Sequence, residues 1–187
     1  MTSLVYNNLL LDKLPTSING LEIKTNFRNS IVFEMLMNDP DLSKEQKLTR
    51  AIDLYFDSYD TVSNAINTLL FFYTCGVERK LHLNGKSVRA IYSFEHDAGY
   101  IFSAFLAQYN IDLNVIEYMH WWKFKALFES LNEDHLISKI MSYRSMDLSQ
   151  IKDKEQRKYY RKLKMAYRLP DNRTDEEKEK DFTNALG

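Results

Sequence analysis

IEYMHWWKFKALFESLNEDHLISKIMSYRSMDLS, residues 116–149, is the stretch that decides the fold. It places two adjacent tryptophans, a histidine and a Tyr-Arg pair in two segments whose apolar residues recur at helical spacing. Asp112 is the expected cap of a helix that runs through the tryptophans, and Asn132 the expected cap of a second helix that runs through Ile140. The stretch therefore predicts two consecutive helices in a helical protein.

A helical wheel over residues 113–131 has two apolar faces with charged residues between them. The broader face holds Trp121, and the opposite face holds Trp122 and Tyr118. We expect Trp121 in the core, so Trp121→Ala is predicted to cost more stability than Trp122→Ala. Tyr118 and Trp122 are candidate partner-binding residues, because exposed aromatic residues are enriched where proteins dock. Burial of Trp122 in the core is the alternative.

The composition favours one aromatic-rich helical domain. The chain has 187 residues, of which 44% are hydrophobic and 27% charged, and 12 Tyr and 11 Phe stand against 5 Gly and 3 Pro. A mainly β protein would need more turn residues. The single cysteine, Cys75, excludes an internal disulfide and fits a reducing compartment, so we expect a cytoplasmic protein. The uncharged stretch 61–77 is too short and too polar to span a membrane.

The remaining elements follow from local signals. Asn19-Gly20 predicts a short β-hairpin over about residues 16–25. Helices are expected over 28–38 with a stripe of Ile31, Val32, Met35 and Leu36, after a Ser43–Gln46 capping box, over 62–73 with Gly76 as a left-handed cap, over 90–109, and from Asp147 or Lys152 to Leu169. A polar loop is expected over 77–87. The prediction is a mainly α fold of about seven or eight helices in one domain over 1–169, followed by an acidic tail or short helix over 170–187.

The titratable residues do not form a pattern typical of catalysis. His96 lies between Glu95 and Asp97, but neighbouring residues on a helix diverge by about 100° and cannot share one metal ion. Glu117 lies one turn from His120, which predicts a buried polar pair with a structural role. We therefore expect no enzyme activity, no catalytic residues, no metal and no cofactor. The alternative is a metal-dependent hydrolase built on His96 and His120, which would carry bound metal.

The segment from Lys152 to Arg168 carries eight cations and two acids, giving 8 − 2 = +6 in a chain whose net charge is −1. Three interpretations stay open. The helix can pack on the domain with its cations in water, dock on an acidic partner such as the tail 171–181, or bind nucleic acid as a module over 152–168. The overall charge disfavours nucleic acid. Lys158, Arg161 and Lys162 are the candidate partner-binding cations.

Five short motifs carry a resemblance to a known family. They are Phe94-Glu95-His96-Asp97, His120-Trp121-Trp122-Lys123-Phe124, Tyr143-Arg144 with Met146-Asp147-Leu148, Ile151-Lys152-Asp153-Lys154-Glu155, and Tyr167 to Pro170. In this order they resemble small proteins encoded in the tail-morphogenesis region of phages of Gram-positive bacteria, which are regarded as tail assembly chaperones.

The resemblance implies a role without chemistry. Such a protein would hold the long tape-measure protein in solution while tail-tube subunits assemble around it, and it offers no catalytic residues to transfer. The expected partners are the tape-measure protein and a possible second client, the tail-tube protein, with self-association left open and no membrane involved. The protein would act in the cytoplasm of the bacterial host and be absent from the mature virion.

Overall fold

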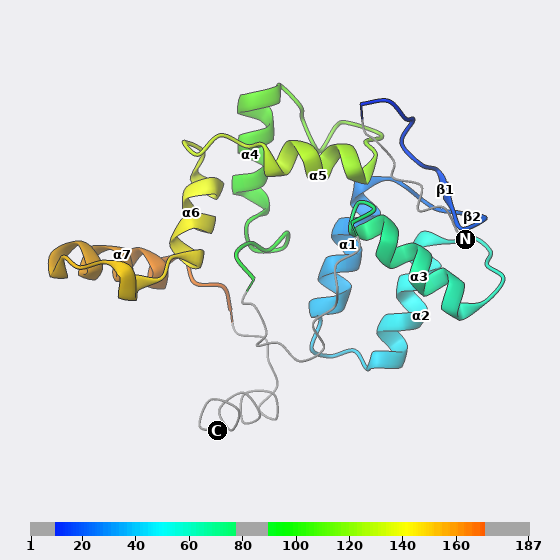
Figure 1. The fold of residues 1–187 in the computed structure, drawn as a ribbon, viewed down its shortest axis with the longest axis horizontal. Coiled ribbons are helices and arrows are strands. Elements are labelled where there is room, and N and C mark those ends of the chain that lie inside the picture. Colours follow the sequence, from blue (N-terminus) through cyan, green and yellow to red (C-terminus); the bar gives the residue numbers. More distant parts are fainter. Residues whose placement is uncertain (1–9, 78–89, 171–187) are drawn as a thin grey trace. The chain divides into compact units, whose positions relative to one another are not determined.

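The computed structural model describes residues 10–77 and 90–170, and it confirms the predicted class: mainly helical with a small N-terminal hairpin (Figure 1). The elements are β1 (Ser17–Ile18), β2 (Leu21–Glu22), α1 (Phe27–Asn38), α2 (Lys44–Tyr55), α3 (Val62–Tyr73), α4 (Ala98–Tyr109), α5 (Trp121–Glu129), α6 (Leu136–Ser145), the 3₁₀ helix η1 (Leu148–Gln150) and α7 (Lys154–Ala166). Most of the predicted loop over 77–87 and the predicted tail or helix beyond Pro170 lie outside the described residues.

The chain divides into two compact units, each made of two separate segments. Unit 1 comprises residues 1–83 and 117–127, and unit 2 comprises residues 84–116 and 128–187. Unit 1 contains the hairpin, α1 to α3 and most of α5, whereas unit 2 contains α4, α6, η1 and α7. The assignment of all these elements to a single domain stays a prediction.

The local signals in unit 1 gave the predicted elements. β1 and β2 pair antiparallel, with Ile18 opposite Leu21, and Asn19 and Gly20 between them have φ of 51° and 80°. The Ser43 hydroxyl accepts the backbone N–H of Gln46, whose side chain accepts the N–H of Ser43, so the predicted capping box is confirmed. These features depend on residues close in sequence, which is why the sequence predicted them.

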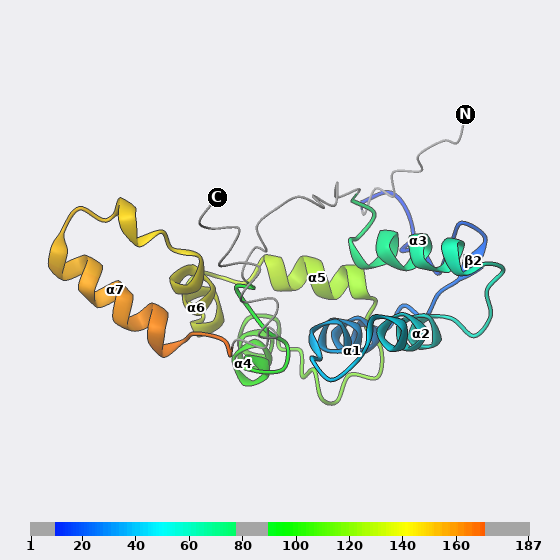
Figure 2. The same cartoon turned by 90° about the horizontal axis from the view of Figure 1, so that it is seen from below.

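The buried face of α1 differs from the predicted stripe. Val32 is 49% exposed and Met35 is 40% exposed, whereas Phe27, Ser30 and Phe33 are buried. α1 and α2 pack side by side (Figures 1 and 2), and the face that meets α2 includes a small polar residue. The buried hydroxyl of Tyr55 on α2 donates to the Ser30 hydroxyl at 2.8 Å. The predicted stripe was based on apolar residues alone, which do not reveal this polar pair. The prediction therefore assigned the wrong face of α1 to the core.

α5 begins at Trp121, nine residues later than the predicted cap at Asp112. Asp112 instead closes a local turn, in which its carboxylate accepts the N–H groups of Asn114 and Val115. The segment just before α5 is extended against the residues before α1. Its backbone bonds run from the Phe27 N–H to the Met119 carbonyl (2.9 Å) and from the Trp121 N–H to the Thr25 carbonyl (2.8 Å).

This pairing invalidates the helical wheel for residues before Trp121. The predicted buried pair of Glu117 with His120 is wrong, because Glu117 is exposed and His120 is buried. The pairing joins residues about ninety positions apart, so no pattern among neighbouring residues predicts it. Asn26 strengthens the pairing with its side-chain amide, which donates to the Glu117 carbonyl at 3.1 Å.

In unit 2, α4 starts at Ala98 rather than Ala90. The preceding residues form a turn in which the Asp97 N–H donates to the Ser93 carbonyl, and the Asp97 carboxylate accepts the Ser93 N–H (both 2.9 Å). Phe94 in this turn is buried and packs with Tyr92 and Phe128. α6 packs against α4 and against α7. The predicted Asn132 cap is displaced, since His135 is the residue that precedes α6.

Candidate partner-binding site

The two tryptophans of α5 are both buried in unit 1. Their indole N–H groups donate to successive carbonyls at the end of α3: Trp121 to Tyr73 at 2.9 Å, and Trp122 to Phe72 at 2.7 Å. The last carbonyls of a helix lack the usual intrahelical partners. The Phe72 carbonyl also accepts the Cys75 N–H at 3.0 Å, so the Trp122 indole adds a second bond to it. Trp121 is 0% exposed and Trp122 is 2% exposed. The expectation of an exposed Trp122 face is therefore wrong, and Trp122 offers no contact surface.

Gly76 permits the close approach of Trp122 to the end of α3. Its φ is +76° and its N–H donates to the Phe71 carbonyl at 2.9 Å. Cys75, the residue after the C-cap Thr74, is also left-handed with φ of 58°, so the predicted left-handed ending of α3 is present but begins one residue before Gly76. A Cβ at this position would lie 3.3 Å from the Trp122 ring. The cap and the indole packing thus need the same glycine.

His120 caps the start of α5. Its Nδ1 accepts the Trp122 N–H at 3.1 Å, and Nε2 lies 3.0 Å from the Pro15 carbonyl, which can only accept. The ring is therefore neutral, with its proton on Nε2. Burial lowers the pKa of His120 below its ordinary value, against a smaller opposing effect of the Pro15 bond. With both nitrogens engaged, His120 has neither a lone pair for a metal nor a free site for acid–base catalysis.

The pH dependence of stability tests this role. Because the folded-state pKa of His120 is lowered, the unfolded chain binds a proton first, so stability falls as pH drops below about 6.5. His120→Asn keeps a cap acceptor but does not titrate. We expect the wild-type urea midpoint to fall between pH 7.5 and 5 more steeply than that of His120→Asn. His96→Asn, at an exposed histidine, is the matched control and should follow the wild type; equal slopes for all three proteins would contradict the prediction.

Unit 2 is held by a buried ion pair. The Arg144 guanidinium binds the Asp97 carboxylate through two bonds, Nη1 to Oδ2 at 2.5 Å and Nη2 to Oδ1 at 2.9 Å. Arg144 Nε also donates to the Tyr167 carbonyl at 2.6 Å, and Nη1 to the Ile91 carbonyl at 3.1 Å. The side chains are 9% and 2% exposed for Arg144 and Asp97 respectively. One arginine therefore joins the turn before α4, the helix α6 and the end of α7.

α7 packs against α6 within unit 2 and has no fully buried residue. Tyr143 of α6 packs with Tyr160 and Tyr167. Two of the cations act locally: Arg157 Nε donates to the Ile151 carbonyl at 2.8 Å, and Lys164 Nζ to the Met146 carbonyl at 2.6 Å. The sequence did not separate these structural cations from the others. The Asp153 carboxylate caps the helix, whereas Asp147 caps η1.

The outward side of α7 mixes cations with exposed apolar side chains. We define the α7 patch by five exposed residues, which are Lys158, Tyr159, Arg161, Lys162 and Met165. Tyr159 is 58% exposed and Met165 is 71% exposed. At 100° per residue, Lys158, Arg161, Lys162 and Met165 fall within about 100° of one another around the helix, and Tyr159 lies at the edge of this group, about 60° from Lys162. The structure brings together the three predicted cations here, whereas Tyr118 belongs to unit 1, where it is 54% exposed and its hydroxyl lies 2.8 Å from that of Thr25.

A protein-family model described as "Bacteriophage Gp15 protein" matches residues 10–169. The chain belongs to the bacteriophage Gp15 protein family. No curated protein and no solved structure matches it. The matched range of this Gp15 protein includes the tryptophan pair, the Asp97–Arg144 pair and α7.

The motifs that suggested a phage protein have structural roles in this Gp15 chain. Three of them, at Asp97, Arg144 and Tyr167, meet in one ion-pair network, and the His120-Trp121-Trp122 motif joins α5 to α3. Their spacing in the sequence gave no hint of these contacts. α6 also holds Lys139 and three serines, so Arg144 did not stand out in the sequence as the partner of a buried acid.

Among residues 10–77 and 90–170 of the Gp15 protein, no three His, Cys, Asp or Glu side chains are grouped so that they could hold a metal ion. His120, one of the two residues of the hydrolase alternative, has both ring nitrogens in hydrogen bonds. In the same part of the chain, every helix is too short or too polar to cross a bilayer.

Proposed function

We propose that this Gp15 family member is a non-enzymatic tail assembly chaperone that binds the tape-measure protein of its phage through the α7 patch. The α7 patch carries the proposal. Exposed Tyr159 and Met165 can cover apolar surface on a helical client, while Lys158, Arg161 and Lys162 attract its acidic residues. Family membership and the resemblance of the motifs to tail-region proteins support a phage assembly role.

The other motif residues support the proposal indirectly. The tryptophans, His120 and Asp97 are buried, and all of them form hydrogen bonds, so none presents a reactive group to solvent. The Arg144 side chain, 9% exposed, is bound to Asp97. An interaction protein needs such a scaffold, with its exposed side chains left for a partner. Tyr118 is a second candidate contact, on unit 1.

Co-expression with the tape-measure protein tests the proposal. We expect the wild-type protein to co-purify with the tape-measure protein and to raise its soluble fraction. Reversal of the three cations (K158E, R161E, K162E) should slow association by about tenfold at low salt and reduce its salt dependence, since exposed charges act mainly on the association rate. Tyr159→Ser with Met165→Ser should instead shorten the lifetime of the complex.

The matched control reverses three exposed cations on other helices (K44E, R50E, K139E), which changes the net charge equally. It should associate like the wild type. Absence of co-purification with the wild-type protein would refute the chaperone role. Retention on DNA at low salt and release at higher salt would favour the nucleic-acid alternative, which also rests on the cations of α7.

The same complex can be analysed for its other expected members. Addition of the tail-tube protein tests a ternary complex, and light scattering of the free protein tests self-association. The proposal has the protein act in the host cytoplasm and leave before the virion is complete, so mass spectrometry of purified virions should not detect it.

A further inference from the structure

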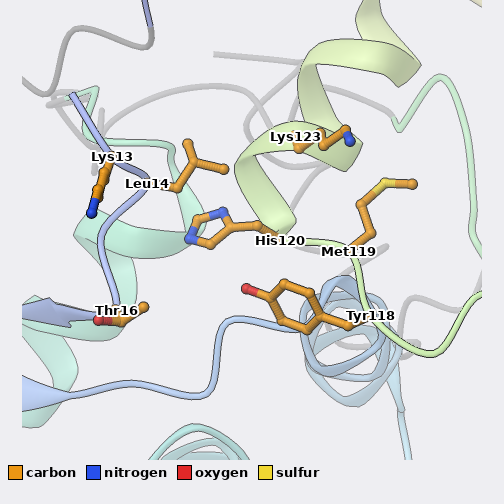
Figure 3. A pocket seen from close by; sticks show the side chains of 7 residues that line it. All are labelled: Lys13, Leu14, Thr16, Tyr118, Met119, His120 and Lys123. Carbon is orange, nitrogen blue, oxygen red and sulfur yellow. The ribbon is translucent and has the colours of Figure 1, made fainter. Parts of the chain in front are cut away.

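Unit 1 has an open hollow of about 360 Å³ between residues 13–16 and the start of α5 (Figure 3). The His120 ring and the Tyr118 hydroxyl are directed toward residues 13–16, whereas the Lys123 ammonium and the Met119 side chain are directed away from them. These lining groups therefore do not converge on one ligand. Helix α4 of unit 2 offers a clearer interaction surface.

The exposed side of α4 carries no charge. Between Asp97 and Asp112 the chain has no charged residue, although 27% of the whole chain is charged. One side of α4 is buried through Ile101, Ala104 and Phe105, and the helix packs against α6. We define the α4 face by five exposed residues of the opposite side, which are Gly99, Tyr100, Ser103, Leu106 and Ala107. Depletion of charge is typical of the centre of a protein interface.

Gly99 has no explanation within its own chain. Its φ lies outside the left-handed region, and an added Cβ would meet no atom within 4 Å in the described part of the chain. Glycine inside a helix is less stable than alanine, so an internal reason for it is missing. A second backbone that approaches the helix from outside would require a residue without a side chain at this position.

The α4 face is arranged symmetrically about Ser103. Gly99 and Ala107 are equally distant from it in sequence, and so are Tyr100 and Leu106. When two copies of α4 lie antiparallel about a twofold axis at Ser103, Gly99 lies at the height of the partner's Ala107, and Tyr100 at the height of the partner's Leu106. The small residues then allow the helices to approach, while the larger side chains cover each other. The antiparallel order also places the positive end of each helix dipole beside the negative end of the other.

We propose that the α4 face binds the α4 face of a second copy of this chain in an antiparallel, twofold-symmetric dimer. The absence of charge favours a copy as the occupant, because the two identical faces meet without like-charge repulsion. The Ser103 hydroxyl donates to the Tyr100 carbonyl of its own helix at 3.0 Å, so it keeps a partner when the face is covered. The inference is independent of the proposed function, since the α4 face and the α7 patch share no residue.

Sedimentation equilibrium of the full chain tests the proposal. One helix face is a small contact, so we expect the average mass to rise from the 22.2 kDa of the monomer towards twice this value, and no further, between about 1 and about 200 µM. Gly99→Gln should weaken the dimer by about tenfold or more, because its side chain separates the two helices. The urea midpoint of Gly99→Gln should equal or exceed that of the wild type, since glutamine favours a helix more than glycine does. Reversal of the α7 cations (K158E, R161E, K162E) is the matched control and should leave the dissociation constant unchanged.

Disulfide cross-linking tests the antiparallel order. In a Cys75→Ser background, which removes the single cysteine, Ser103→Cys should give a covalent dimer on oxidation, because both copies of residue 103 lie at the axis. Ala107→Cys is the matched control and should not cross-link, since its two copies lie about 12 Å apart along the helices. A parallel pair would instead bring the two copies of either residue together.

Four results would overturn the proposal. A wild-type protein that is monomeric at about 200 µM forms no such dimer, and masses beyond the dimer contradict a closed twofold contact. A dimer that is unchanged in Gly99→Gln, or that is lost on reversal of the α7 cations, uses another surface. Equal cross-linking of Ser103→Cys and Ala107→Cys contradicts the antiparallel pairing about Ser103.

Discussion

Arg144→Met is expected to lower the unfolding free energy of unit 2 by about 3–5 kcal/mol, because it removes one partner of a buried ion pair. The carboxylate of Asp97, whose side chain is 2% exposed, would lose both bonds to the guanidinium. The carbonyls of Tyr167 and Ile91 would lose donors as well. A domain with a typical stability of 5–15 kcal/mol would be left near the limit of folding.

A double-mutant cycle separates the pair from its surroundings. Asp97→Leu with Arg144→Met removes both charges and should recover part of the stability lost by Arg144→Met alone, since no buried charge is then unpaired. Arg161→Met, at an exposed arginine, is the control and should cost less than about 0.5 kcal/mol. Both tryptophans lie in unit 1, so hydrogen exchange of α4 and α6 amides, followed by mass spectrometry, is the suitable measurement. Additive effects of Asp97→Leu and Arg144→Met would show that the pair is not coupled.

Trp122→Ala is expected to destabilise unit 1 as much as Trp121→Ala, by about 3–5 kcal/mol each. Both indoles are buried, and each donates to one carbonyl at the end of α3. This replaces the ranking from the helical wheel, in which Trp121 alone belonged to the core. The wheel failed because it included residues before Trp121 that are not helical.

Tryptophan-to-phenylalanine variants divide the effect into packing and hydrogen bonding. Phenylalanine keeps an aromatic ring but removes the indole hydrogen bond. This loss costs about 0.5–1.5 kcal/mol where the carbonyl keeps another donor, as the Phe72 carbonyl does with the Cys75 N–H. We therefore expect the unfolding free energy of Trp122→Phe, measured by chemical denaturation, to lie between those of the wild type and Trp122→Ala. The same order is expected for Trp121→Phe and Trp121→Ala. A loss for Trp122→Ala below about 1 kcal/mol would mean that its ring is not part of the core.

The sequence predicted what neighbours in the chain determine. The Asn19-Gly20 turn, the Ser43 capping box and the Gly76 cap each depend on residues within a few positions, and each is present. The starts of α4 and α5 were wrong because partners distant in sequence determine them. The Asp97 carboxylate binds Arg144, 47 residues away, and the residues before Trp121 pair with those before Phe27.

In the candidate partner-binding site, too, the sequence predicted some features and missed those that depend on distant residues. Lys158, Arg161 and Lys162 were predicted to be exposed on the basic helix and are exposed. The sequence could not show that Arg157 and Lys164 bind backbone carbonyls instead, because those acceptors lie on loops whose path was unknown. Trp122 was misplaced since an exposed and a buried indole look alike in a list of apolar residues.

The interleaving of the two units affects how the protein can be made and divided. Unit 1 includes residues 117–127. A fragment that ends near residue 83 therefore lacks both indoles. It also lacks the extended segment in which the Tyr118 hydroxyl meets that of Thr25, 93 positions earlier in the chain. We expect no stable fold for that fragment.

On the ribosome, the first segment must wait until residue 127 has emerged before its core can close, and contacts so distant in sequence are slow to form. Until then its aromatic residues are open to other proteins, so the protein that is proposed to protect a client passes through an unprotected stage of its own.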